Sequence, residues 1–77
     1  MSVAKRSVIV AGHRTSVSLE TEFWEELTDI AKARDISLNA LVGEVDATRV
    51  GNLSSALRLF VLRVVKTRAI NDPQAVE

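Results

Sequence analysis

The chain has 77 residues, with ten basic and ten acidic side chains, one histidine and no cysteine. A domain of this size buries only about 60% of its unfolded surface, and disulfides or thiolate metal sites are excluded as stabilising elements. The hydrophobic fraction of 47% is ordinary for a globular protein, and no apolar run approaches the ~20 residues of a membrane span. We therefore expect a cytoplasmic protein without cofactor or metal, stabilised by self-association.

Charge is unevenly distributed along this neutral chain. Residues 1–19 hold three basic and no acidic residues, whereas residues 20–77 hold seven basic and ten acidic ones. We interpret residues 1–11, which include Lys5 and Arg6, as a basic N-terminal arm. A dimer that brought two such segments together would concentrate about six positive charges on one face, enough to attract a polyanion.

Residues 13–19 have the alternating pattern of a β-strand. The period of two sets Arg14, Ser16 and Ser18 against Thr15, Val17 and Leu19, which predicts one polar and one buried face. A local hairpin with Val8-Ile9-Val10 through a turn at Gly12 is one alternative, but an isolated two-stranded hairpin is marginally stable. Pairing of the strand with its own copy in a second chain solves this problem more fully, so we expect an intertwined homodimer.

Three helices are predicted after the strand, over residues 21–34, 38–49 and 53–68. The first has an apolar stripe with glutamates in its first turns. Ser37 is a good N-cap for the second, and Gly51 is expected to end that helix. The third is apolar over most of its circumference, with Leu59 and Leu62 outside its main stripe. Such a helix is normally buried on several sides, which is a second sign of oligomerisation and leaves open a higher-order assembly through this helix. Residues 69–77 lose the periodicity and are predicted to form a flexible tail.

This order of elements resembles the ribbon-helix-helix superfamily of bacterial DNA-binding proteins. The resemblance rests on Arg14-Thr15-Ser16-Val17-Ser18-Leu19, the helix that follows, and Ile36-Ser37-Leu38 at the start of the next helix. The later segment from Asn52 to Arg58 is similar to a short stand-alone bacterial subfamily with an added third helix. The implied fold is mainly α with one β-strand, in which two chains form an intermolecular antiparallel ribbon above their interlocked helices.

The resemblance also implies functional residues. The ribbon would enter the major groove of double-stranded DNA, with Arg14, Ser16 and Ser18 contacting base edges. The start of the second helix, at Ser37, Leu38 and Asn39, would bind a phosphate through backbone N–H groups. Lys5 and Arg6 would add phosphate contacts. The residues assigned to the dimer core are Thr15, Val17, Leu19, Phe23, Trp24, Leu27, Ile30, Leu41, Val42, Val45, Leu57, Phe60, Val61 and Val64.

Three features depart from the usual pattern of the superfamily. The net charge is zero, small serines stand where longer polar side chains are common, and Asp35 stands where glycine is common. The sequence therefore supports two functions, a homodimeric transcriptional regulator and a protein-interaction or ligand-sensing module, including an antitoxin-like role, without strong DNA binding. The lone His13 cannot form a metal site or a catalytic triad, so we expect no enzyme.

Overall fold

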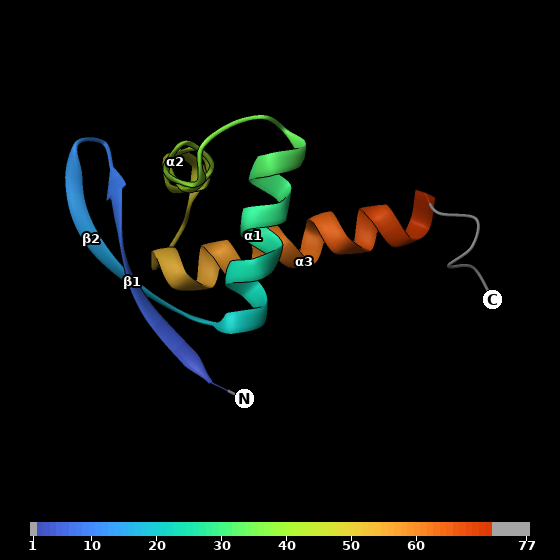
Figure 1. Cartoon of the computed structure of the whole chain (residues 1–77), viewed down its shortest axis with the longest axis horizontal. Coiled ribbons are helices and arrows are strands. Elements are labelled where there is room, and N and C mark those ends of the chain that lie inside the picture. The colour runs from blue at the N-terminus through green and yellow to red at the C-terminus, as the bar shows by residue number, and fades with distance from the viewer. Residues whose placement is uncertain (1, 72–77) are drawn as a thin grey trace.

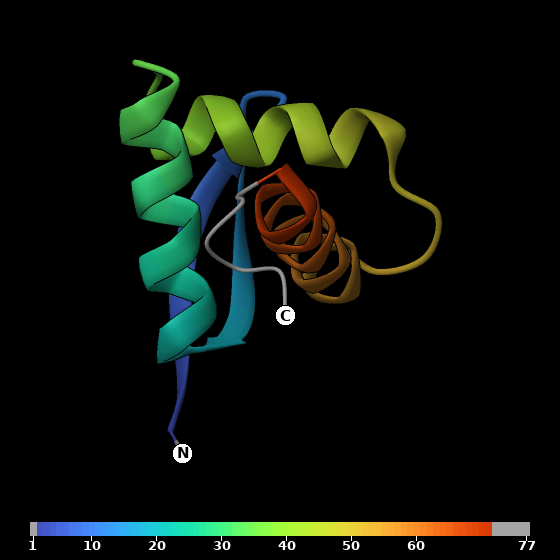
Figure 2. The ribbon, with the colours of Figure 1, turned by 90° about the vertical axis from the view of Figure 1, so that its right-hand side faces the viewer.

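The computed structural model describes residues 2–71, which form a two-stranded sheet and three helices. In chain order these are β1 (Val3–Val10), β2 (His13–Glu20), α1 (Thr21–Ala33), α2 (Leu38–Thr48) and α3 (Leu53–Asn71). The hairpin lies on one side of the molecule and the helices on the other (Figure 1). Seen from the helical side, α1 and α2 meet near a corner and α3 runs beneath α2, away from the hairpin (Figure 2).

The two strands pair with each other inside one chain. They are antiparallel and fully in register from Val3 opposite Glu20 to Val10 opposite His13. Ala11 and Gly12 join them with φ angles of 52° and 80°, and positive φ angles at both central residues are what a tight two-residue hairpin turn requires. The structure of the chain thus differs from the predicted ribbon, because β1 takes the place expected for a second copy of β2. It also corrects the interpretation of residues 1–11 as an arm, since residues 3–10 are a strand.

Helix α1 begins directly after β2 and packs a stripe of Trp24, Leu27, Ile30 and Ala31 into the core. It ends in a hydrogen-bonded turn in which the Asp35 N–H donates to the Lys32 carbonyl and the Ile36 N–H to the Ala31 carbonyl. Asp35 has a φ of 56°, the left-handed conformation that such a helix end needs. Aspartate adopts it at a lower cost than most residues other than glycine.

Helices α2 and α3 each begin at a polar capping residue. The Ser37 hydroxyl accepts a hydrogen bond from the Ala40 N–H at 3.0 Å, and the Asn52 side chain accepts one from the Ser55 N–H at 2.8 Å. Both caps satisfy an N–H group that has no partner inside its helix. Helix α3 continues to Asn71, beyond the predicted end at residue 68, and the remainder of the predicted tail, residues 72–77, lies outside the described residues.

The core lies between the inner face of the hairpin and the three helices. Most residues assigned to a dimer core are buried within this single chain, while Phe23, Phe60 and Val64 are half-buried and Thr15 is exposed. The indole N–H of Trp24 donates to the Ala4 carbonyl at 3.0 Å, which fastens α1 to β1. The buried residues from that assignment are Val17, Leu19, Trp24, Leu27, Ile30, Leu41, Val42, Val45, Leu57 and Val61.

Candidate nucleic-acid interface

The outer face of the hairpin consists of four cross-strand pairs. At the open end Val3 lies opposite Glu20, and towards the turn the pairs are Lys5 with Ser18, Ser7 with Ser16, and Ile9 with Arg14. In these last three pairs Ser18 is half-buried and the other five side chains are exposed. We call the six residues of these three pairs the outer ribbon face. Arg14, Ser16 and Ser18 lie on this side of the strand, as the alternation predicted, and β1 contributes three further residues that the sequence interpretation did not assign to a ribbon.

The hydrogen-bond pattern brings these outer side chains close to one another. The Thr21 N–H donates to the Ser2 carbonyl at 3.1 Å, so residues 2 and 21 form a hydrogen-bonded pair. Such pairs alternate along an antiparallel ladder with non-hydrogen-bonded pairs, whose side chains lie closer together. The three pairs of the outer ribbon face are therefore of the closer kind, and each presents two neighbouring side chains outward.

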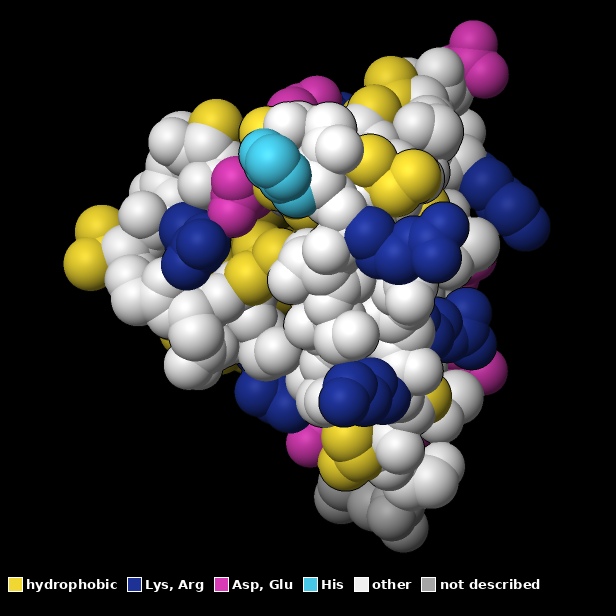
Figure 3. Space-filling model, turned by 90° about the vertical axis from the view of Figure 1, so that its left-hand side faces the viewer, with side chains coloured by type: hydrophobic (Ala, Val, Ile, Leu, Met, Phe, Trp, Pro, Cys, Tyr) yellow, Lys and Arg dark blue, Asp and Glu magenta, His cyan; other side chains and the backbone are white. Residues whose placement is uncertain are grey.

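The six residues of the outer ribbon face carry positive charge, and the carboxylate of Glu20, at the open end of the same side of the hairpin, is paired with Arg58. The two ionised side chains of the outer ribbon face are Lys5 and Arg14. Figure 3, which looks onto the hairpin side, shows basic side chains on this surface and few acidic ones. The two strands lie about 4.8 Å apart, and the major groove of DNA is about 12 Å wide and admits a two-stranded ribbon. In its dimensions and charge, this face is suited to contact with DNA.

At the β2 edge, Arg58 of α3 binds the end of the hairpin. Its Nε donates to the Glu20 carboxylate at 2.9 Å, and a second guanidinium nitrogen donates to the Ser18 carbonyl at 3.3 Å. The hydrogen bond from Arg58 lowers the pKa of Glu20 below its usual value. The charge of Glu20 is thereby balanced beside the outer ribbon face, and part of the open edge of β2 is occupied.

The N-terminus of α2 lies at the β1 edge. The Asn39 side-chain oxygen accepts a hydrogen bond from the backbone N–H of Ile9 at 3.2 Å. The N–H groups of Leu38 and Asn39, in the first turn of α2, have no carbonyl four residues earlier in the helix to bind. Such N–H groups form an anion site together with the helix dipole. The predicted phosphate anchor is thus adjacent to the ribbon, although the Asn39 side chain itself is engaged in positioning β1.

Other predicted site residues have different surroundings. Arg6 faces inward, and its guanidinium lies 5.4 Å from the centre of the Trp24 ring, a distance typical of a cation–π contact. His13 is exposed beside the hairpin turn, opposite Val10. Of the two basic residues of the predicted arm, Lys5 belongs to the outer ribbon face. A phosphate contact by Lys5 or Arg6 stays a prediction.

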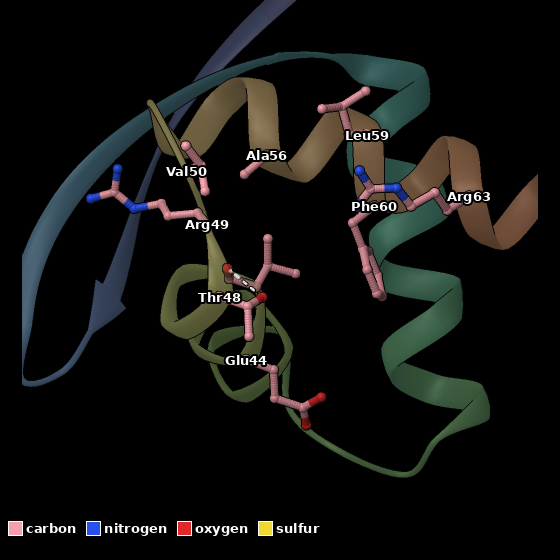
Figure 4. Close-up of a pocket in the computed structure, with 9 residues that line it drawn as sticks. Glu44, Thr48, Arg49, Val50, Ala56, Leu59, Phe60 and Arg63 are labelled. Atoms are coloured by element: carbon pink, nitrogen blue, oxygen red, sulfur yellow. Dashed lines mark hydrogen bonds between the residues drawn. The ribbon is translucent and has the colours of Figure 1, made fainter.

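A concave site lies between α2 and α3. It is a pocket of about 420 Å³. Figure 4 shows its residues coming from α2, the loop after it and α3. The lining is mixed, because apolar Val45, Leu59 and Phe60 lie beside charged Glu44 and Arg63. Such a mixture suits a small amphipathic molecule.

Membrane spans and metal clusters are both missing from residues 2–71, the described part of the chain. None of the helices there is long and apolar enough to cross a membrane. No group of three or more histidine, cysteine, aspartate or glutamate side chains in this part is arranged to hold a metal ion.

Comparison with known proteins gives a family match. A family model described as "ribbon-helix-helix domain" matches residues 3–65. Among solved structures, the chain is similar to an uncharacterized protein from Bordetella pertussis Tohama I, with a TM-score of 0.72 and 27% sequence identity. The similarity covers 99% of this chain and 67% of that one. No curated protein matches.

Proposed function

Because the chain belongs to the ribbon-helix-helix domain family, we propose that it is a cytoplasmic bacterial transcriptional regulator, with no catalytic role, that inserts its β-ribbon into the major groove of double-stranded DNA. The observation that carries this proposal is the outer ribbon face. It combines two cations with three serines, and the carboxylate of Glu20, on the same side of the hairpin, is paired with Arg58. The width of the outer ribbon face also suits the groove.

Each part of this face has a distinct role in the proposed complex. Arg14 binds the two acceptors of a guanine, because a guanidinium offers donors in a matching fork. Ser7 and Ser16 donate to or accept from base edges, and Lys5 binds a phosphate. The N–H groups at the start of α2 hold a phosphate beside the groove, and this contact fixes the depth and angle at which the ribbon enters.

We further propose that the regulator is a homodimer joined through α3. If copies paired through the open edges of β2, the sheet would have four strands, which is too wide for the major groove. Arg58 also occupies that edge at Ser18. By contrast, α3 exposes Leu59, Leu62 and Val65, whose exposed fractions are 48%, 50% and 38%. Burying these side chains between two copies would give the small domain the additional stabilisation it needs.

DNA binding is tested by fluorescence anisotropy with short genomic duplexes, first at low salt and then over a salt series. The proposal predicts binding that weakens steeply as salt increases, because each phosphate contact releases counterions. Arg14→Ala should cost about 1–3 kcal/mol on a preferred duplex and relax its sequence preference. Absence of binding to every fragment at low salt would overturn the proposed function.

The dimer is tested by light scattering on the purified protein. Wild-type protein should have twice the chain mass, and Leu62→Glu should shift it towards the monomer because a carboxylate would be buried at the contact. Thr67→Glu adds the same charge at another exposed position of α3 and serves as the matched control. Monomeric wild-type protein at the concentrations used for DNA binding would contradict the dimer.

A second candidate function, ligand sensing, is supported by the pocket between α2 and α3. A ligand there would contact Arg63 and Phe60. It would change the position of the C-terminal end of α2 relative to α3. Mass spectrometry of protein purified under native conditions tests this function directly. A small molecule that copurifies with wild-type protein and is lost from Phe60→Ala supports it, and empty wild-type protein speaks against it.

A further inference from the structure

An exposed isoleucine stands among the polar residues of the outer ribbon face. Ile9 is 49% exposed, whereas its strand neighbours Val8 and Val10 are 3% and 8% exposed and face the core. Val17 and Leu19, on the inner face of β2, are also buried. The exposed part of the Ile9 side chain therefore does not contribute to the core. An apolar residue at this position is better explained by a contact with another molecule.

Ile9 is placed beside the residue that is best suited to read a base. It is the direct cross-strand partner of Arg14 in a pair of the closer kind, so the two side chains project side by side, with Cβ atoms about 5 Å apart. Successive base pairs are about 3.4 Å apart along the helix axis. When Arg14 contacts one base, Ile9 is within reach of its neighbour.

The chemistry of the major groove offers one apolar group to such a side chain. Thymine exposes its C5-methyl group there, while the other base edges present hydrogen-bond donors and acceptors. An isoleucine cannot form hydrogen bonds, and it would leave those donors and acceptors without partners. The outer side of Ile9 therefore favours thymine over the other three bases.

The position of Ile9 is fixed by its backbone. Its N–H donates to the Asn39 side chain in the first turn of α2, where the backbone N–H groups form the proposed phosphate anchor. A phosphate held there and a base read by Ile9 are thereby set at a constant separation. Direct readout by an apolar side chain requires such a fixed position, because its contact with a single methyl group of the base is lost if the ribbon shifts.

We propose that Ile9 reads the C5-methyl group of a thymine next to the guanine bound by Arg14. This inference rests on the proposed function, since it requires that the outer ribbon face enters the major groove. It adds a specificity-determining residue from β1, the strand that pairs with the predicted ribbon strand. The recognised step contains one thymine and one guanine as neighbours.

The test removes the methyl group from DNA and the side chain from the protein independently. Duplexes are first selected by the wild-type protein from a random library, and each thymine of the preferred duplex is then replaced in turn by deoxyuridine, which pairs identically and lacks the methyl group. Affinities are measured for wild type, Ile9→Ser and Val3→Ser. Serine has no methyl group and already occupies exposed positions of both strands at Ser7 and Ser16, and Val3 is an exposed control on the same side of the hairpin, opposite Glu20.

The proposal predicts that deoxyuridine at one thymine next to a guanine weakens wild-type binding about fourfold, the equivalent of one buried methyl group. Ile9→Ser should bind the thymine and deoxyuridine duplexes equally, while Val3→Ser should keep the wild-type preference. Wild-type protein that binds all deoxyuridine duplexes as tightly as the parent would overturn the role of Ile9 and leave DNA binding intact. Failure to select any duplex would instead overturn the proposed function, and the role of Ile9 with it.

Discussion

Asn39 and Ile9 join the first turn of α2 to the edge of β1, through a hydrogen bond of 3.2 Å from the Ile9 N–H to the Asn39 side-chain oxygen. The N–H groups of an edge strand that point away from its partner strand are otherwise unpaired. The bond therefore satisfies a backbone donor of β1 and also sets the ribbon at a fixed place relative to the N-terminus of α2. Both elements belong to the proposed DNA interface.

This contact gives a prediction that separates stability from binding. Asn39→Ala should lower the free energy of unfolding by about 0.5–1.5 kcal/mol, the usual net value of one hydrogen bond, and should also weaken DNA binding. Asn39→Asp keeps an acceptor for the Ile9 N–H, so its stability should stay close to wild type. Its negative charge beside the phosphate anchor should nevertheless weaken DNA binding. Urea denaturation and anisotropy measure the two quantities, and an Asp variant that binds DNA normally would contradict the anchor.

The hairpin turn contains a residue in an unfavourable conformation. Ala11 has a φ of 52°, and asparagine adopts such angles more readily than alanine. Ala11→Asn should therefore stabilise the protein by about 0.5–1 kcal/mol. The opposite sign is expected for the control Ala47→Asn, because Ala47 is an exposed residue inside α2 and asparagine is a poorer helix former. Urea midpoints with unchanged slopes measure both effects.

The ion pair between Arg58 and Glu20 should make stability depend on pH. The pKa of Glu20 is lowered in the folded chain by the hydrogen bond from Arg58. As the pH falls, this carboxylate therefore takes up a proton at a higher pH in the unfolded chain than in the folded chain. The stabilisation is fully present above the ordinary glutamate pKa of about 4.3 and is lost as the pH falls through the lowered value. Chemical denaturation at a series of pH values should show a shallower acid decline for Glu20→Gln than for wild type. Arg58→Gln should share that shallower decline, and an unchanged decline would contradict the role of the pair.

Cysteine substitutions test whether the ribbon is formed within one chain. The chain has no cysteine, and Ser7 lies directly opposite Ser16. Oxidation of Ser7→Cys/Ser16→Cys should give a disulfide within the chain, with monomer mobility on a non-reducing gel. In a symmetric ribbon between two chains, residue 16, at the centre of residues 13–19, would face its own copy. Efficient dimer formation by Ser16→Cys alone would therefore contradict the hairpin.

The helices could be predicted from the sequence because their signals are local. The apolar stripe of α1 and the cap at Ser37 define their segments without reference to the rest of the chain. The same holds for the two faces of β2, whose alternation placed Arg14 and Val17 on opposite sides. Period and capping are properties of a few neighbouring residues, so they are visible in one dimension.

The role of β1 could not be predicted because its alternation is broken at three positions. Arg6 lies on the inner face, where the Trp24 ring accommodates its charge, and Val3 and Ile9 lie on the outer face, where they are 59% and 49% exposed. None of the three can be explained by the pattern of β1 alone. The short Val8-Ile9-Val10 run and Gly12 indicated a local hairpin, but they did not decide between pairing within one chain and pairing between two. The contact between Asn39 and Ile9 joins residues 30 positions apart, and the pattern of neither segment predicts it.

The central claim is that the outer ribbon face, formed by one chain, is the surface that binds DNA. Its most direct test is a titration of isotopically labelled protein with a selected duplex, followed by backbone amide chemical shifts. The largest changes should fall on residues 5–9 and 14–18 and on the first turn of α2, with small changes along the exposed side of α3. Changes confined to α3 and the pocket beside it, with the hairpin signals unmoved, would contradict the claim.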